Sequence, residues 1–175
     1  HGVSRRGSNL AHALGPRRAT VCDADSMVRL QGTPLRTVHR ADALAWLRDN
    51  AAAPGTSVVT SLPDVSELGL DATRWRAWFV DAARAVIEWL PDDGVAIFFQ
   101  SDIVRQGVWI DKSYLVLRAA EIADAPLVWH KIVCRSAPGT TTRGRASYSH
   151  LLCVARRPPP PSAGAFPDVL PDAGF

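Results

Sequence analysis

The feature that most constrains the fold is a regular alternation of short apolar runs with amphipathic stretches. The apolar runs at residues 57–61, 95–99 and 127–133 are continuous rather than alternating in polarity. Between the first two, residues 74–90 repeat apolar side chains at three- and four-residue steps, which predicts an amphipathic helix. Continuous apolar strands separated by helices are typical of a parallel sheet buried on both faces. The sequence therefore predicts an α/β, Rossmann-like fold with a mostly parallel sheet flanked by helices.

The remaining elements complete this sheet. Residues 41–50 and 113–122 are predicted to be helices, and residues 37–39 and 148–155 are predicted to be strands. No helix separates 127–133 from 148–155, so these two strands are expected to form an antiparallel pair at one edge. We predict a flexible basic arm at 1–19, a folded domain at 20–157 and a Pro-rich tail at 158–175 that contains no clear element.

Composition excludes several classes of protein. The chain has 175 residues, of which 47% are hydrophobic, so it can bury about two-thirds of its unfolded surface without a metal or disulfide. No apolar run approaches the roughly twenty residues of a membrane span, and no signal peptide is recognisable, which predicts a cytoplasmic location. The three cysteines lack a C-x-x-C spacing and are expected to be buried reduced thiols.

The charge is mildly basic, with a formal net charge of +3. All basic residues except Lys112 and Lys131 are arginine. The planar guanidinium binds phosphate in a bidentate manner, so this bias favours a nucleic-acid partner. The composition of the genome would produce the same bias, and the sequence does not separate these two explanations.

The segment at 60–67, Thr-Ser-Leu-Pro-Asp-Val-Ser-Glu, is the most informative candidate site. In doubly wound sheets ligands bind at the carboxyl ends of the strands, and this segment follows a predicted strand. Pro63 restricts Leu62 to an extended conformation, which directs backbone carbonyls toward such a ligand. The alternative is that Asp64 or Ser66 caps a following helix, with Glu67 in its first turn.

The order of these segments resembles the permuted, beta-type amino-methyltransferases, which use S-adenosylmethionine to methylate adenine N6 or cytosine N4. The resemblance covers about residues 37–157 and depends on ordered spacing, since no single motif is specific. Residues 41–44 approximate the family's Gly-Asp-x-x-x-x-Leu segment, and Ser61-Leu62-Pro63-Asp64 stands where the family has Asp/Ser-Pro-Pro-Tyr. Residues 91–99 match the Lys-Pro-Gly-Gly turn and strand, while Val128-Trp129-His130-Lys131 and residues 150–154 match its last two strands.

This resemblance implies S-adenosylmethionine as the cofactor and assigns roles to matched positions. The expected cofactor-binding residues are Asp42, Thr60, Ser61, Gln100 and Asp102. The expected catalytic residues are Ser61, Leu62, Pro63, Asp64 and Glu67. No metal site is implied.

The sequence departs from the family pattern at two places. Leu62 replaces a proline and Asp64 replaces the aromatic ring that stacks on a flipped base. We therefore expect Asp64 or Glu67 to accept a proton or to orient a polar nucleophile. The family's glycine-rich cofactor loop has no counterpart among the twelve glycines, which predicts that these residues are the N-terminal part of a longer protein.

A nucleic-acid substrate, DNA or RNA, is the expected partner. The candidate substrate-binding residues are Trp109, Lys112, Arg135, Arg143, Arg145, Tyr148 and His150. The arginines are equally compatible with an ordinary surface loop, and Tyr148, His130 and His150 with packing inside the sheet.

Two other functions remain open from the sequence. The first is a non-catalytic nucleic-acid-binding module of the same fold. The second is a metal-dependent hydrolase in which Asp64, Glu67 and Asp102 hold Mg²⁺ or Mn²⁺.

Overall fold

The computed structural model describes residues 37–137, 139–140, 144–158 and 167–171. It divides into two units, His1–Arg40 and Ala41–Phe175, and only four residues of the first are described. The strand predicted at residues 37–39 is wrong, because these residues pair with no strand and Val38 is 74% exposed. The fold described below is that of the second unit.

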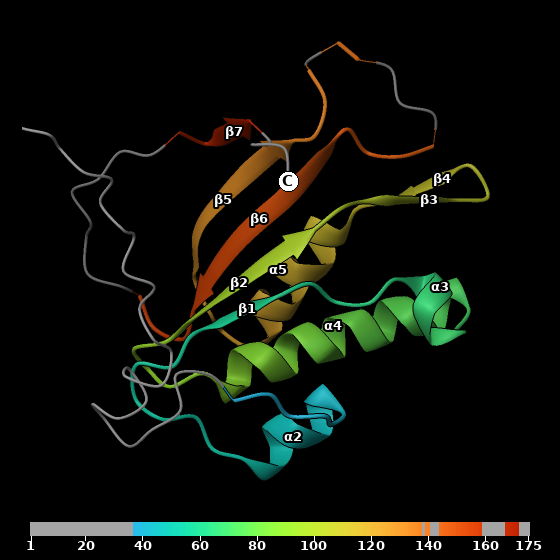
Figure 1. Cartoon of the computed structure of the whole chain (residues 1–175). Helices are drawn as coiled ribbons and strands as arrows, with labels where there is room; N and C mark the ends of the chain where they lie inside the picture. The colour runs from blue at the N-terminus through green and yellow to red at the C-terminus, as the bar shows by residue number, and fades with distance from the viewer. Residues whose placement is uncertain (1–36, 138, 141–143, 159–166, 172–175) are drawn as a thin grey trace, which may run out of the picture. The chain divides into compact units, whose positions relative to one another are not determined.

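A five-stranded sheet forms the centre of this unit (Figure 1). Its strands are β1 (Val58–Thr60), β2 (Val95–Gln100), β5 (Leu127–Cys134), β6 (Tyr148–Ala155) and β7 (Val169–Pro171), in the order β1-β2-β6-β5-β7. The pairs β1–β2 and β5–β7 are parallel, whereas β6 is antiparallel to both β2 and β5. Four strands therefore point the same way and β6 alone is reversed, which confirms the α/β class, the mostly parallel sheet and the antiparallel pairing of β5 with β6. This pair lies inside the sheet and not at its edge as predicted, because β7 pairs with the outer side of β5.

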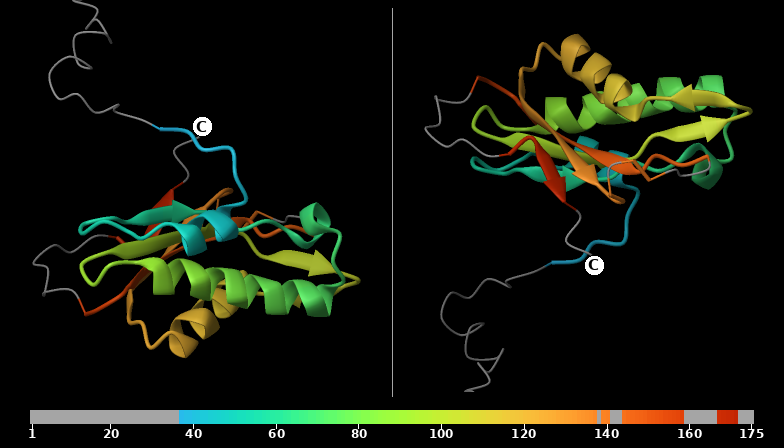
Figure 2. Two further views of the ribbon diagram at one scale, coloured as in Figure 1. Left: turned by 90° about the horizontal axis from the view of Figure 1, so that it is seen from below. Right: turned by 90° about the horizontal axis from the view of Figure 1, so that it is seen from above.

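Two helices cover one face of the sheet side by side (Figure 2). These are α4 (Ala72–Trp89) and α5 (Lys112–Ile122), and both extend the helices predicted at these positions by one or two residues at the start. A shorter helix, α2 (Ala43–Asp49), packs against α4, where the rings of Trp46 and Trp89 lie 5.8 Å apart. The helices predicted from the sequence are thus all present.

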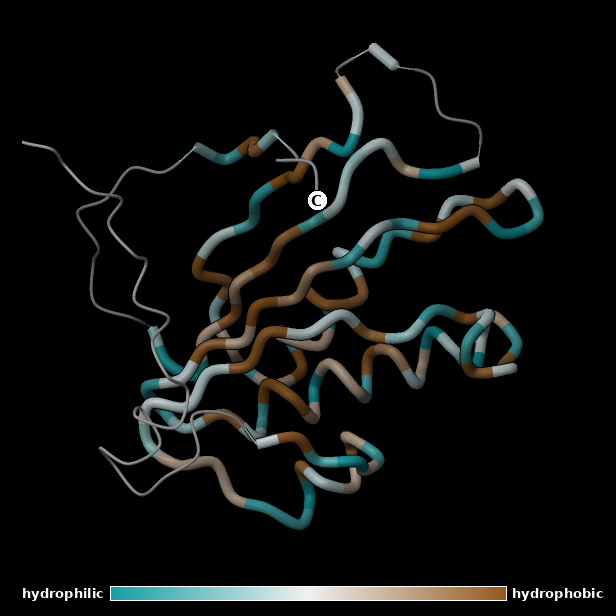
Figure 3. Tube along the Cα trace, viewed as in Figure 1, coloured by the Kyte–Doolittle hydropathy of each residue, from teal (hydrophilic) through white to brown (hydrophobic). Residues whose placement is uncertain are grey.

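The hydrophobic core lies between the sheet and these two helices. Asp71 caps α4 by accepting from the backbone N–H of Arg74 at 2.9 Å, and Trp75 and Phe79 then point into the core with no exposed surface. Figure 3 shows hydrophobic residues concentrated along the strands. On the other face, Val59 is 73% and Phe99 is 41% exposed, so the prediction that β1 and β2 are fully buried is wrong at these positions.

Three short strands were not predicted: β3 (Ile103–Arg105), β4 (Val108–Ile110) and β7. Helix α3 (Val65–Leu68) was predicted only as the alternative interpretation of residues 60–67. Strands β3 and β4 form an antiparallel hairpin whose turn residues, Gln106 and Gly107, have φ angles of 51° and 75°. Two consecutive positive φ angles are the signature of a type I′ turn, which suits the twist of a hairpin. The expectation of no element after residue 158 is wrong for β7, which extends the sheet beside β5.

Two further expectations concern the cysteines and membranes. Cys153 is a buried free thiol, and burial raises its pKa to about 11, while Cys134 is a half-buried free thiol and Cys22 lies outside the described residues. In the described part of the chain, no helix combines the length and the apolar character needed to cross a bilayer.

Candidate functional site

A polar cleft of about 520 Å³ opens at the carboxyl ends of β1 and β2. We call it the polar cleft. Four parts of the chain form its walls: the segment after β1, the segment from the end of β2 into β3, the start of α5, and the loop between β5 and β6. The residues from the sequence-predicted site that line it are Ser61, Leu62, Asp64, Glu67, Gln100, Asp102, Lys112, Arg135 and Arg145.

The other predicted site residues lie elsewhere. Asp42 caps α2, where it accepts from the backbone N–H of Ala45 at 2.8 Å, and neither Asp42 nor Thr60 lines the polar cleft. The carbonyl of Pro63 accepts from the indole N–H of Trp75 at 3.2 Å. Arg143 lies outside the described residues. Trp109, Tyr148 and His150 do not line the cleft but contact one of its residues, Asp102.

Asp64 and Lys112 form an ion pair in the wall of the polar cleft. The Lys112 Nζ lies 3.0 Å from the Asp64 Oδ1, although the two residues are far apart in the sequence. The Lys112 side chain is only 6% exposed, and its Nζ also lies 5.7 Å from the ring centroid of Trp75. A buried ammonium needs a counter-charge, so this lysine fixes the position of the Asp64 carboxylate.

The same carboxylate begins α3. Asp64 is the N-cap residue, and the Glu67 carboxylate accepts from the backbone N–H of Asp64, which completes a capping box. The alternative interpretation of this segment, a capped helix with Glu67 in its first turn, is therefore confirmed. Because Glu67 is engaged with the backbone, Asp64 is the carboxylate of this segment that remains oriented toward the cleft and its lysine.

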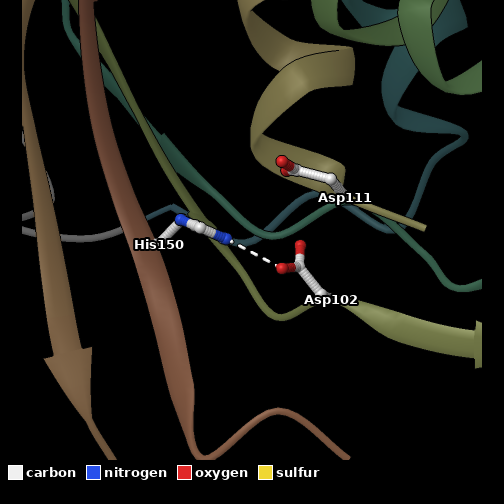
Figure 4. Close-up of side chains that lie close together, drawn as sticks. All are labelled: Asp102, Asp111 and His150. Carbon is white, nitrogen blue, oxygen red and sulfur yellow. Dashed lines mark hydrogen bonds and ion pairs between the residues drawn. The ribbon is translucent and has the colours of Figure 1, made fainter. Parts of the chain in front are cut away.

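A buried polar network surrounds Asp102 (Figure 4). Its Oδ1 accepts from the backbone N–H of Lys112 at 2.8 Å, and its Oδ2 accepts from His150 Nε2 at 3.0 Å, Tyr148 Oη at 3.2 Å and Trp109 Nε1 at 3.4 Å. Burial alone would raise the pKa of the Asp102 carboxyl. The hydrogen bonds from His150 and Lys112 and the charge of His150 outweigh burial, so the pKa is lowered.

A second histidine extends the network into the sheet. In its neutral form His150 donates from Nε2 to Asp102, so its Nδ1 accepts from His130 Nε2 at 2.9 Å. Burial and the neighbouring His150 lower the pKa of His130. Burial and the Asp102 charge raise the pKa of Tyr148. His130 is thus a hydrogen-bonded sheet residue, in agreement with the packing interpretation.

The network does not suit a metal ion. The ligand atoms of Asp102, Asp111 and His150 lie within 4.8 Å of one another. Three donors already converge on Asp102 Oδ2, however, and an indole or backbone N–H cannot become a metal ligand. Asp111 caps α5 through the backbone N–H of Tyr114 at 3.0 Å. The hydrolase hypothesis also requires Asp64 and Glu67 beside Asp102, and the structure engages them with Lys112 and the α3 backbone instead.

Gln100 is the one cleft residue with an unsatisfied buried group among the described residues. It is 1% exposed, and its Nε2 has no hydrogen-bond partner. A buried donor without a partner costs about 1–3 kcal/mol, so a ligand or water in the polar cleft is its natural partner.

Some cleft residues were missed by the sequence analysis. They are Phe99, Ile103, Val104, Arg105, Gly144 and Ala146. The signal that would have found the β3 residues is Gln106-Gly107 between two apolar pairs, which marks a hairpin turn directly after β2.

The structure is a Rossmann-like α/β fold with a polar cleft at the carboxyl ends of its parallel strands β1 and β2, the place where ligands bind in doubly wound sheets. No family model and no curated protein matches the sequence. Among solved structures, a protein from Thermus thermophilus assigned as a DNA modification methylase superimposes with a TM-score of 0.58 at 16% identity, over 77% of this chain and 67% of that one. Its complex with S-adenosyl-L-methionine gives a TM-score of 0.57.

A second neighbour is the PvuII DNA methyltransferase, which is cytosine-N4-specific. It superimposes with a TM-score of 0.58 at 16% identity, over 77% of this chain, which spans 56% of the length of that enzyme. At this identity the likeness concerns the fold, and the fold is the one that the sequence resemblance implied.

Proposed function

We propose that this chain carries the acceptor-binding part of an S-adenosylmethionine-dependent methyltransferase that acts on a nucleic acid. The observation that carries the proposal is the position of the segment Ser61–Asp64. It follows β1 directly, lies in the polar cleft, and belongs to a sheet in which a reversed strand, β6, lies between β2 and β5. The chain superimposes on a protein assigned as a DNA modification methylase and on the PvuII DNA methyltransferase.

The residues of the cleft fit a polar ligand on the side formed by Ser61 and Gln100. Gln100 holds a buried amide nitrogen without a partner, and a ligand oxygen or nitrogen in the cleft would satisfy it after a small adjustment of the side chain. We assign Ser61, Gln100 and Asp102 to the cofactor side. When bound, S-adenosylmethionine supplies an electrophilic methyl group on a sulfonium. Asp42 and Thr60, which the sequence predicted to bind the cofactor, do not line the polar cleft and are not assigned to the cofactor.

The contribution of the chain to methyl transfer is positioning. Asp64 is held by Lys112 and by the α3 cap, so it presents a fixed negative charge to the N–H or O–H of an acceptor. It orients the nucleophile and receives the proton that the acceptor loses as the new bond to carbon forms. Arg135 and Arg145, which line the cleft from the loop between β5 and β6, are assigned to substrate phosphates.

The absence of a stacking ring next to Pro63 supports an acceptor held by polar contacts. A second candidate function is favoured by another observation, the engagement of Asp64 in a helix cap and an ion pair. If these contacts keep Asp64 from accepting a proton, the cleft serves a nucleic-acid-binding module without methyl transfer. Cofactor binding separates these two functions.

The decisive experiment is a calorimetric titration of S-adenosylmethionine at low salt into this chain and into a version extended beyond residue 175. We expect saturable binding by at least one of the two, weakened by Ser61→Ala and Gln100→Ala. The matched control is Asp92→Asn, in an exposed turn where Asp92 pairs with Arg157 at 3.2 Å. Oligonucleotide binding without cofactor binding by either version would establish the binding module instead.

Methyl transfer is then measured with a labelled methyl group on single- and double-stranded DNA and on RNA. Asp64→Asn is expected to lower kcat by about 100-fold, the size of a typical general-base contribution, while Asp92→Asn leaves it unchanged. Equal activity of Asp64→Asn and the parent would remove Asp64 from the proposed mechanism.

A further inference from the structure

A second cavity, of about 790 Å³, lies on the helix side of the molecule between α4, α5 and β4. We call it the helix groove. The β3–β4 hairpin separates it from the polar cleft: Ile103, Val104 and Arg105 of β3 line the polar cleft, whereas Trp109 and Ile110 of β4 line the helix groove. Figure 1 shows this hairpin projecting past the end of β2. The two cavities are therefore neighbours across a single ridge.

The helix groove exposes two aromatic rings. Trp109 is 47% exposed and Tyr114 is 58% exposed, and both line the groove. The Trp109 ring is anchored through its Nε1, which donates to Asp102 at 3.4 Å. An aromatic ring that is anchored by its polar edge and exposed on its face is suited to stacking, and every nucleic-acid base has a face that can stack on it.

The groove also carries positive charge. Arg76 comes from α4 and Arg118 from α5, both are exposed, and neither forms an ion pair with any residue that the structure describes. The acidic groups of the groove are partly engaged: Asp81 lies 3.9 Å from Arg84, and Asp111 accepts from the Ser113 hydroxyl at 2.7 Å. The arginines are therefore available for an anionic ligand.

We propose that the helix groove binds a single-stranded segment of nucleic acid, with bases on Trp109 and Tyr114 and phosphates on Arg76 and Arg118. Stacked rings next to free arginines are the usual means of binding single strands without sequence preference. Paired bases in a duplex do not expose their faces to such rings, so single strands are the preferred form. The inference rests on the proposed function in one respect, that the substrate is a nucleic acid. The bound nucleic-acid strand crosses the β3–β4 hairpin, and the nucleotide next to the stacked bases enters the polar cleft.

The test measures binding of labelled oligonucleotides of about ten nucleotides by fluorescence anisotropy, without cofactor, at several salt concentrations. The double variant Arg76→Glu/Arg118→Glu is expected to bind at least tenfold more weakly. Its salt dependence is expected to fall by about 1.4 in the slope of log K against log salt, the value for two lost contacts to a single strand. Tyr114→Ala is expected to lower the affinity for the oligonucleotide by roughly 5- to 150-fold. Trp109→Phe keeps a stacking ring and is expected to lower the affinity less than Trp109→Ala does.

The matched control is Arg48→Glu/Arg157→Glu, which makes the same change in net charge at two exposed arginines that do not line the groove. All variants are checked for an unchanged thermal unfolding midpoint. The inference is overturned if the groove variants bind as this control does, or if a duplex binds more tightly than a single strand.

The proposed function and this inference fail separately. Oligonucleotide binding that depends on the groove, with no cofactor binding by either length of chain, would overturn methyl transfer and leave the groove assignment in place. Methyl transfer to a nucleic acid with unchanged KM in Arg76→Glu/Arg118→Glu would support the proposed function and overturn the groove assignment.

Discussion

Lys112 connects three parts of the molecule through one residue. Its backbone N–H donates to Asp102, its Nζ pairs with Asp64, and its ammonium lies over the ring of Trp75 in the core. The polar network, the polar cleft and the hydrophobic core therefore meet at a single residue at the start of α5. A change of its side chain alters the contacts in the cleft and the core, whereas the backbone N–H that donates to Asp102 stays in place.

Replacing Lys112 with methionine is expected to lower the free energy of unfolding by about 1–3 kcal/mol, because the change removes the buried partner of Asp64. Asp64→Asn in the same chain is expected to recover part of this loss, with a coupling of about 1 kcal/mol. Urea denaturation of the four proteins in this cycle measures the coupling. Arg74→Met, which breaks an exposed pair with Asp71, is the control and is expected to change stability by less than about 0.5 kcal/mol. Additive effects of the two cleft substitutions would contradict the ion pair.

His130 and Asp102 of the network predict a pH dependence of stability. Burial and His150 lower the pKa of His130 below its ordinary value of 6.5, so the unfolded chain binds a proton that the folded chain does not. Stability is therefore expected to decline as the pH falls below about 6.5. The pKa of Asp102 is lowered from its ordinary value of 3.8, so this carboxylate stabilises the folded chain at pH values above 3.8. That stabilisation is lost as the pH falls below 3.8.

Thermal unfolding of the parent and of His130→Gln between about pH 5 and pH 7.5 measures the contribution of His130. The glutamine keeps an N–H donor for His150 but does not titrate, so its unfolding midpoint is expected to fall less steeply with acid. Parallel pH profiles of the two proteins would show that His130 titrates alike in the folded and unfolded chains.

At the scale of elements, the β3–β4 hairpin is held by its turn, by Ile110 in the hydrophobic core and by the hydrogen bond from Trp109 to Asp102. Its two strands have three residues each and form a separate two-stranded sheet, with an isolated bridge from Ile103 to Arg145. The left-handed conformations of Gln106 and Gly107 therefore contribute to the stability and the register of the hairpin.

Substitutions in this turn are expected to act in opposite directions. Gly107→Ala is expected to destabilise the protein by about 1 kcal/mol, because a side chain disfavours a positive φ. Gln106→Asn is expected to stabilise it slightly, because asparagine tolerates the left-handed region better than glutamine. Chemical denaturation measures both. Effects of the same sign would mean that the turn has another conformation in solution.

The sequence predicted the elements that have a periodic or continuous apolar pattern, and it missed β3, β4 and β7 for a physical reason. Helix α4 and strand β6 present several turns or a complete apolar run, so their periodicity is visible, and the predicted bounds of β6 match those of the structure. Helix α3 and the hairpin consist of three or four residues per element and are defined by a capping box and a turn. Such local devices leave little periodic signal.

The site was predicted in the same uneven way. The carboxyl ends of β1 and β2 follow from the topology rule, and the residues next to these strands do line the polar cleft. The Asp64–Lys112 pair and the Asp102–His150 bond join residues from different elements. Their distances depend on how α5 and β6 pack against the sheet, which no local pattern contains.

At the scale of the whole molecule, β7 adds a strand to the sheet from beyond residue 157. It pairs with β5, and Lys131 on β5 donates to the carbonyl of Pro167 at 2.7 Å and lies 3.5 Å from Asp168. A chain that ends at residue 157 lacks this strand and exposes the backbone edge of β5.

We expect that shortened chain to have a lower thermal unfolding midpoint and a tendency to self-associate through the exposed edge. Differential scanning fluorimetry and sedimentation velocity test the two effects. Lys131→Ala in the full chain serves as the control, since it removes the side-chain contacts and keeps the strand pairing. Equal midpoints for the shortened and the full chain would place the boundary of the folded unit at residue 157.

The reversed strand β6 has a consequence for the order in which the protein folds. It occupies the place between β2 and β5, so β2 acquires its second neighbour only after β5 and β6 have both been synthesised and β6 has reached its place. Until then the edge of Val95–Gln100, an apolar strand, has no partner on that side. The rate at which the sheet folds is therefore limited by a late, non-local pairing, which is slow. Until it forms, the unpaired apolar edge of β2 can associate with other nascent chains. The step most vulnerable to aggregation, and most responsive to chaperones during synthesis, is the insertion of the β5–β6 pair beside β2.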